Sequence, residues 1–220
     1  MKAVILGAGA QGRVACDLLQ SSESEFSEIE FLDDNESLWG RQINGVEVAG
    51  SLDRLLDYDK NNFRVLIALG NPKDKERMFL DSRLRDVLYL NIVHSTAYLA
   101  PSTAPGAGNT ISAQAVVNSN SELSKHILVN TGAIVEHDCR VGDFVTIGPG
   151  ALLGGRVEVS ARAFIASRAV IMARKKIGAG SIVAAGSLVT ADVPDNTLVM
   201  GVPARVKYEI DEQYDWRRLL

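Results

Sequence analysis

Residues 129–159 read VNTGAIVEHDCRVGDFVTIGPGALLGGRVEV, and this stretch decides the fold. An aliphatic residue opens each block of six, and the same register runs from Val93 to Val189, interrupted only at Pro105. An α-helix repeats every ~3.6 residues and a strand every ~2, so neither sustains a period of six, whereas stacked hexapeptide coils do. The pattern therefore predicts a parallel β-helix over residues 91–207.

Two further positions of the repeat suit the corners of such a helix. Four residues after the aliphatic position a small side chain is usual, as at Ala115, Ala133 and Ala151. Glycine often follows the aliphatic residue directly, as at Gly142 and Gly148, where a corner needs backbone freedom. We interpret these residues as the packing residues of the coils.

The first 90 residues follow a different pattern. Short aliphatic runs such as residues 2–6 (KAVIL) and 64–69 (RVLIAL) alternate with segments of helical periodicity. This alternation is typical of a parallel α/β sheet covered by helices. The sequence therefore predicts an α/β, Rossmann-like half domain over residues 1–90, the all-β helix over 91–207, and a C-terminal tail at 208–220.

Composition limits the partners. A net charge of -4 gives no general attraction to nucleic acid or to anionic membranes, so small molecules are the expected ligands.

The two cysteines, Cys16 and Cys139, have no spacing typical of a disulfide framework or a zinc site. There is no signal-peptide pattern, and no apolar run approaches the roughly 20 residues of a membrane span. We expect a soluble, cytoplasmic protein without a metal.

The segment Glu136-His137-Asp138 stands out within the repeats. It places an imidazole and two carboxylates where neighbouring hexads carry glycine, alanine or serine. By register His137 falls near a corner, where its ring is exposed. Neutral histidine is suited to act as a general base near pH 7, and a neighbouring carboxylate holds one ring nitrogen as a proton donor. We expect His137 to be the base and Asp138, with Glu136 second, to be its partner.

A glycine-rich loop, residues 7–12 (GAGAQG), lies between the first predicted strand and the first predicted helix. Such a loop favours a phosphate at the helix N-terminus, and Asp33 and Asp34 follow the second strand where a ribose-binding acid is expected. The motif alone fits either a nicotinamide dinucleotide or another nucleotide. Only about 90 residues precede the repeats, which is enough for one mononucleotide-binding half.

Five landmarks in order carry a family resemblance: GAGAQGRV, FLDDN, IALGN, NTGAIVEHDCRVGD and GVPAR. Residues 1–207 resemble the sialic acid O-acetyltransferase NeuD and PglD-type sugar-nucleotide N-acetyltransferases, which are hexapeptide-repeat acyltransferases. The resemblance implies a left-handed β-helix with three hexads in each coil, a homotrimer with active sites between subunits, and acetyl-CoA as co-substrate. It also implies that the first domain holds the nucleotide of an activated sugar.

The resemblance assigns roles to further residues. Gly155 lies 18 residues after His137, and in a coil of three hexads that is one strand spacing, roughly 4.8 Å, so its backbone N–H would bind the developing oxyanion. Gln11 stands where PglD-like proteins often carry histidine. The expected coenzyme contacts are Gly155, Ala166, Ala184, Ala185 and Arg205, and the expected substrate contacts are Gly9, Gln11, Gly12, Asp33, Asp34, Asn71 and Asn130. The basic residues Arg168, Arg174, Lys175 and Lys176 fit either the coenzyme phosphates or a solvated face.

We predict N-acetylation of the amino group, at the 4-position, of a nucleotide-linked deoxy amino sugar used in surface polysaccharide biosynthesis. O-acetylation of sialic acid or CMP-sialic acid is the alternative within the family, and a non-catalytic, nucleotide-binding trimeric scaffold is the alternative outside it. The nucleotide, whether UDP, dTDP, GDP or CMP, stays open. His94, His126 and His137 are too scattered for the three-histidine zinc site of γ-class carbonic anhydrases, which share this helix.

Overall fold

A computed structural model describes residues 1–21, 26–211 and 214 of the chain. Its N-terminal part is one sheet in the order β3-β4-β2-β1-β5, parallel except for the β3–β4 pair. The strands are β1 (Lys2–Leu6), β2 (Glu28–Leu32), β3 (Gln42–Ile43), β4 (Val46–Gly50) and β5 (Phe63–Ile67). The helices are α1 (Ala10–Ser21) and α2 (Pro72–Phe79), with the 3₁₀ turns η1 (Glu36–Leu38), η2 (Leu52–Asp57) and η3 (Ser82–Leu84). Apolar clusters on both faces of the sheet make this the predicted α/β half domain.

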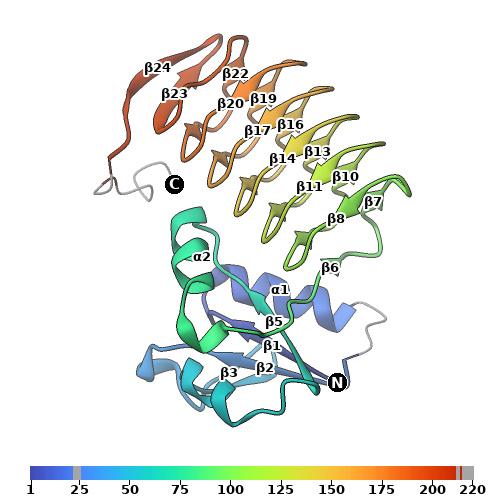
Figure 1. Ribbon diagram of the computed structural model, residues 1–220, viewed down its shortest axis with the longest axis vertical. Coiled ribbons are helices and arrows are strands. Elements are labelled where there is room, and N and C mark those ends of the chain that lie inside the picture. The colour runs from blue at the N-terminus through green and yellow to red at the C-terminus, as the bar shows by residue number, and fades with distance from the viewer. Residues whose placement is uncertain (22–25, 212–213, 215–220) are drawn as a thin grey trace.

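The remainder is the predicted left-handed parallel β-helix (Figure 1). Each coil contributes one two-residue strand to each of three sheets, and strands 18 residues apart pair in parallel, as Val117 does with Val135 and Val135 with Leu153. The second residue of each strand points inward, and these residues form one continuous buried core. Pro105 keeps the register, because β8 pairs with β11 as the other coils do. Val93 at the open first coil is exposed.

The three sheets of the β-helix differ in their outer faces: one faces the α/β domain, one carries charged side chains and one carries apolar side chains. The domain-facing sheet contains β6 (Ile92–Val93), β9 (Thr110–Ile111), β12 (Leu128–Val129), β15 (Thr146–Ile147), β18 (Phe164–Ile165), β21 (Ile182–Val183) and the antiparallel hairpin β23 (Thr197–Gly201) and β24 (Ala204–Glu209). The charged sheet contains β8 (Ala104–Pro105), β11 (Glu122–Leu123), β14 (Arg140–Val141), β17 (Glu158–Val159) and β20 (Lys176–Ile177). The apolar sheet contains β7 (Tyr98–Leu99), β10 (Val116–Val117), β13 (Ile134–Val135), β16 (Leu152–Leu153), β19 (Val170–Ile171) and β22 (Leu188–Val189).

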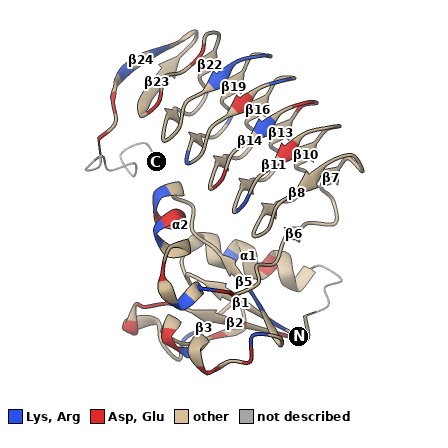
Figure 2. Cartoon of the chain, in the orientation of Figure 1, with Lys and Arg blue, Asp and Glu red and all other residues tan. Residues whose placement is uncertain are grey.

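The outward residues of these sheets differ in chemistry. On the charged sheet Glu122, Arg140, Glu158 and Lys176 form an exposed ladder of alternating sign, visible as red and blue bands in Figure 2. On the apolar sheet the outward side chains are partly exposed and apolar in every coil. They are Tyr98, Val116, Ile134, Leu152, Val170 and Leu188.

The α/β domain packs on the β-helix through α2 (Figure 1). Phe79 of α2 lies with its ring centroid 4.9 Å from that of His126, a coil-corner residue. Glu76 on the same helix pairs with Arg162 Nη1 at 2.8 Å. The buried amine of Lys75 donates to the His126 carbonyl at 3.1 Å and to Thr146 Oγ1 at 3.3 Å. Helix α2 therefore docks on successive coils, since His126 and Arg162 lie 36 residues, or two coils, apart.

No helix among the described residues is long and apolar enough to cross a membrane.

Candidate active site

The corner between β13 and β14 carries the candidate base. His137 Nδ1 and Asp138 Oδ2 are 2.8 Å apart, and just over half of the His137 side chain (53%) is exposed. Asp138 turns the corner with a left-handed backbone, φ 59°. Because a carboxylate only accepts, Nδ1 carries the proton in this pair, and in the neutral ring Nε2, which lies beside Gly155, is the atom with the lone pair.

Asp138 is held from both neighbouring coils. Arg156, 18 residues later, places Nε 3.5 Å from Asp138 Oδ2, and Asn120, 18 residues earlier, donates to Oδ1 at 3.5 Å. The hydrogen bond from His137, together with the one from Asn120 and the charge of Arg156, holds the pKa of Asp138 below its ordinary value. Asp138 therefore stays ionised and keeps the imidazole in one orientation.

Gly155 lies directly against the imidazole. A Cβ built on Gly155 would lie 2.7 Å from His137 Nε2 and 2.8 Å from Cε1, closer than any carbon approaches without displacing the ring. The backbone amides on either side of Gly155 already donate hydrogen bonds to neighbouring coils: Gly154 N–H donates to the Ile171 carbonyl, and Arg156 N–H donates to the His137 carbonyl. Within the described residues, the Gly155 N–H has no hydrogen-bond acceptor. The corner thus offers a backbone donor beside the base.

A second feature is the cleft between the two domains, with a volume of about 460 Å³. The glycine-rich loop forms one wall, and the domain-facing sheet and its corners form the other. Five of the residues expected in the site line this cleft together: Gly9, Gln11, Asn130, Ala166 and Ala185. Thr146 also lines it, and its hydroxyl donates to the carbonyl of Gly70 at 3.1 Å.

The glycine-rich loop is closed by Asp33, whose Oδ2 accepts from the Ala8 amide at 2.8 Å and whose Oδ1 accepts from the Asn35 amide at 2.9 Å. Gly12 is buried in α1, where a Cβ would lie 1.9 Å from the Gly7 carbonyl oxygen. Gly12 therefore lets α1 approach β1 and is absent from the lining of the cleft.

The other expected residues lie elsewhere. Asp34 accepts from the Leu52 amide and pairs with Arg83, and Asn71 caps α2 by accepting from the Lys73 amide at 2.9 Å. Ala184 is buried. Arg205 lies on β24, where its Nη1 donates to the Ala204 carbonyl at 2.9 Å. None of these lines the cleft.

The basic residues 168–176 do not form one patch. Arg168 lies at the corner between β18 and β19, and Arg174 lies at the next corner, between β19 and β20. Lys176 pairs with Glu158 at 3.2 Å on the charged sheet. Lys175 lies in a regular coil, its carbonyl accepting from the Glu158 amide. His94 and His126 lie at other corners, and no group of metal-ligating side chains occurs among the described residues.

Sequence reasoning missed Arg156 and Lys75. Arg156 follows Asp138 by 18 residues, so the coil period that singled out Gly155 also places Arg156 beside Asp138. Lys75 gave no signal, because its partners lie 51 and 71 residues away in the other domain.

The cleft and the base flank one face of the β-helix. Asn130 follows β12 at the corner that leads into β13, and His137 follows β13 at the next corner. The apolar sheet therefore runs between them. In a single chain the base and the cleft are at opposite edges of this sheet.

A β-helix of hexapeptide coils with a histidine and carboxylate pair at one corner defines a hexapeptide-repeat acyltransferase. Residues 2–81 match the family described as the PglD N-terminal domain. The chain is 34% identical over 161 residues to the GDP-perosamine N-acetyltransferase of Escherichia coli O157:H7, covering 70% of this chain and 71% of that protein. It belongs to the PglD-type family of sugar N-acetyltransferases.

Two solved structures of sugar acetyltransferases are similar to this chain over most of its length. PerB from Caulobacter crescentus, in complex with CoA and GDP-perosamine, is 30% identical with a TM-score of 0.87, over 94% of this chain and 98% of that one. The acetyltransferase domain of PglB from Neisseria gonorrhoeae FA1090, in complex with acetyl coenzyme A, is 31% identical with a TM-score of 0.88, over 94% of this chain and 98% of that one.

Proposed function

We propose that the protein transfers the acetyl group of acetyl-CoA to the amino group, at the 4-position, of a nucleotide-linked deoxy amino sugar. The observation that carries the proposal is the His137 and Asp138 pair, 2.8 Å apart, with the bare backbone of Gly155 against the ring. The similarity to PerB, which binds CoA and GDP-perosamine, supports the substrate class.

His137 is the general base in this proposal. As the amine nitrogen attacks the acetyl carbonyl carbon, His137 Nε2 accepts the amine proton and Asp138 stabilises the imidazolium that forms. The Gly155 N–H donates to the oxyanion of the tetrahedral intermediate. Collapse of the intermediate breaks the C–S bond, and the coenzyme A thiolate takes the proton that His137 accepted from the amine and leaves as the thiol, which returns His137 to its neutral form.

The nucleotide end belongs in the α/β domain. The N-terminus of α1 directs backbone N–H groups and the positive end of the helix dipole toward a phosphate, and Gly9, just before α1, and Gln11, in its first turn, line the cleft. Asn130 provides a polar side chain on the opposite wall. A sugar extending from the phosphate would then lie along the domain-facing sheet.

The complete site requires a second copy of the chain in this proposal. Six outward apolar side chains on the apolar sheet, among them Tyr98 with 53% of its surface exposed, provide a face for a homotrimer. Since this face separates the cleft from His137, packing copies through it brings the cleft of one subunit toward the His137 corner of its neighbour. That geometry gives one active site at each subunit interface.

The test is coenzyme A release from acetyl-CoA, followed with a thiol reagent, across UDP-, dTDP- and GDP-linked 4-amino sugars and sialic acid. Release with an amino sugar nucleotide and an acetamido product supports the proposal and names the nucleotide. Release with sialic acid alone moves the activity to O-acetylation. No release from a folded protein that still binds nucleotide supports a non-catalytic scaffold.

A further inference from the structure

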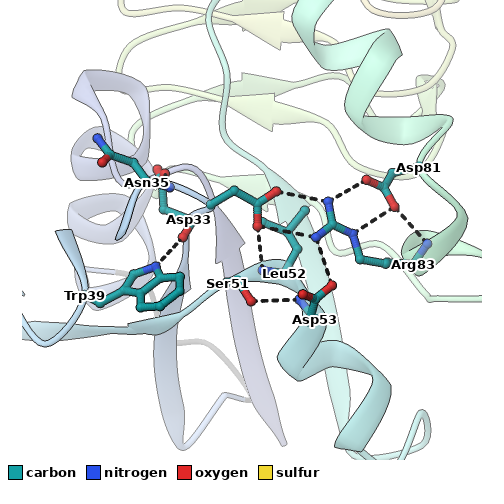
Figure 3. A network of polar contacts seen from close by, with 9 residues as sticks. Asp33, Asn35, Trp39, Ser51, Leu52, Asp53, Asp81 and Arg83 are labelled. Carbon is teal, nitrogen blue, oxygen red and sulfur yellow. Dashed lines mark hydrogen bonds and ion pairs between the residues drawn. The ribbon is translucent and has the colours of Figure 1, made fainter. Parts of the chain in front are cut away.

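Arg83 lies at the centre of a polar network that joins three connections of the α/β domain (Figure 3). Its Nη2 is 2.7 Å from Asp81 Oδ2 and 3.0 Å from Asp34 Oδ2, and its Nη1 is 3.1 Å from Asp53 Oδ1. Asp34 follows β2, Asp53 lies in η2, and Asp81 precedes η3. One guanidinium therefore links the segments after β2, β4 and α2.

The network is unbalanced in charge, since three carboxylates meet one cation. Arg83 is 23% exposed, so its interactions are less screened than those of a surface pair. Its hydrogen bond lowers the pKa of Asp81, and the bond to Asp81, followed by those to Asp34 and Asp53, raises the pKa of Arg83. Without Arg83, three negative side chains would repel one another and separate.

Among the three carboxylates of this network, Asp34 is nearest in sequence to the glycine-rich loop and directly follows Asp33, which bonds that loop. Its Oδ1 accepts from the Leu52 amide at 3.0 Å, and both of its oxygens accept from Arg83. Its neighbour Asp33 closes the loop through the Ala8 amide. About half of the Asp34 side chain (51%) is exposed, so its carboxylate has free lone pairs in a fixed direction.

We infer that Arg83 is a positioning residue for the nucleoside end of the sugar nucleotide, because it fixes the Asp34 carboxylate as an acceptor for a ribose hydroxyl or a base N–H. Arg83 acts through Asp34 and does not contact the ligand. The inference rests on the proposed function for the identity of the ligand. A bidentate guanidinium is required, because an ammonium cannot hold two carboxylates in a fixed fork.

The experiment compares Arg83→Met, Arg83→Lys, Asp34→Asn and Asp81→Asn in steady-state kinetics, varying the sugar nucleotide and acetyl-CoA separately. We expect Arg83→Met and Asp34→Asn each to raise KM for the sugar nucleotide about tenfold, with kcat within about twofold and KM for acetyl-CoA unchanged. The double variant should be no worse than either single variant. Arg83→Lys should recover only part of the loss.

Asp81→Asn is the structural control, because it weakens the scaffold and leaves the Arg83 to Asp34 contact in place. A lower Tm with unchanged KM in Asp81→Asn, beside the raised KM of Arg83→Met, supports the inference. An unchanged KM for the sugar nucleotide in both Arg83→Met and Asp34→Asn overturns it, as does an equal rise in KM for acetyl-CoA.

Calorimetric titration with GDP and UDP separates this inference from the proposed function. If the wild-type protein acetylates no sugar but binds a nucleoside diphosphate, the proposed function fails. The inference about Arg83 is then tested by comparing the nucleotide affinity of Arg83→Met with that of wild type. An affinity about tenfold weaker than wild type supports it, and an equal affinity overturns it.

Discussion

The amine of Lys75 is buried between the two domains, and no carboxylate among the described residues pairs with it. Burial lowers the pKa of Lys75 from 10.5 to about 7, whereas the unfolded chain keeps the ordinary value. Between these pH values the unfolded state binds a proton that the folded state does not, so stability rises with pH by about 1.4 kcal/mol per unit. From pH 7.5 to pH 9 the gain from this one group is about 2 kcal/mol.

Lys75→Met removes the titration and retains most of the packing. The carbonyl of His126 loses its partner, a cost of about 1–3 kcal/mol that does not depend on pH. The measurement is urea unfolding of wild type and variant at pH 7.5 and 9, at one protein concentration, with Met in place of the exposed Lys73 of the same helix as the control. Wild type should gain about 2 kcal/mol on Lys75→Met over this range. Parallel curves would show that the folded protein keeps Lys75 charged and would refute the reasoning.

Three further predictions concern the proposed active site. Gly155→Ala should lower kcat by about 10-fold or more, because the new methyl displaces the His137 ring. Its Tm should stay near that of wild type, since Ala173 occupies the same corner in the next coil, and unchanged turnover would argue against the site. Asp138→Asn should lower kcat by about 10–100-fold, less than loss of His137, with KM for both substrates preserved; a change in KM alone would contradict its role. Leu152→Glu on the apolar sheet should yield monomers in analytical ultracentrifugation and abolish transfer; active monomers would contradict a site shared between copies.

The fold was predictable because its signal is local and repeated. A period of six recorded from Val93 to Val189 needs no knowledge of distant contacts, and it also fixes which residues stack. The same period gives Gly155 as the neighbour of His137, and it gives Arg156 as the neighbour of Asp138. Where the β-helix is regular, residues 18 apart in sequence are therefore neighbours in adjacent coils.

The α/β domain and its junction were less predictable, because their contacts join segments with no shared period. Asp34 has the position of a ribose-binding acid, yet Arg83, 49 residues later, decides how its carboxylate is held. The motif predicts that Gly12 lies near a phosphate. In the structure Gly12 packs against the Gly7 carbonyl, where any side chain would prevent α1 from lying so close to the end of β1. Lys75 and Thr146 meet only because the domains dock through α2.

The most direct test of the central claim is the turnover of His137→Asn, assayed with the amino sugar nucleotide that wild type acetylates. General base catalysis contributes typically about 10²–10⁴-fold, so kcat should fall by that factor while the affinities for coenzyme A and for the nucleotide stay within about threefold of wild type. Turnover within about threefold of wild type, by a protein that binds both substrates, would contradict the account.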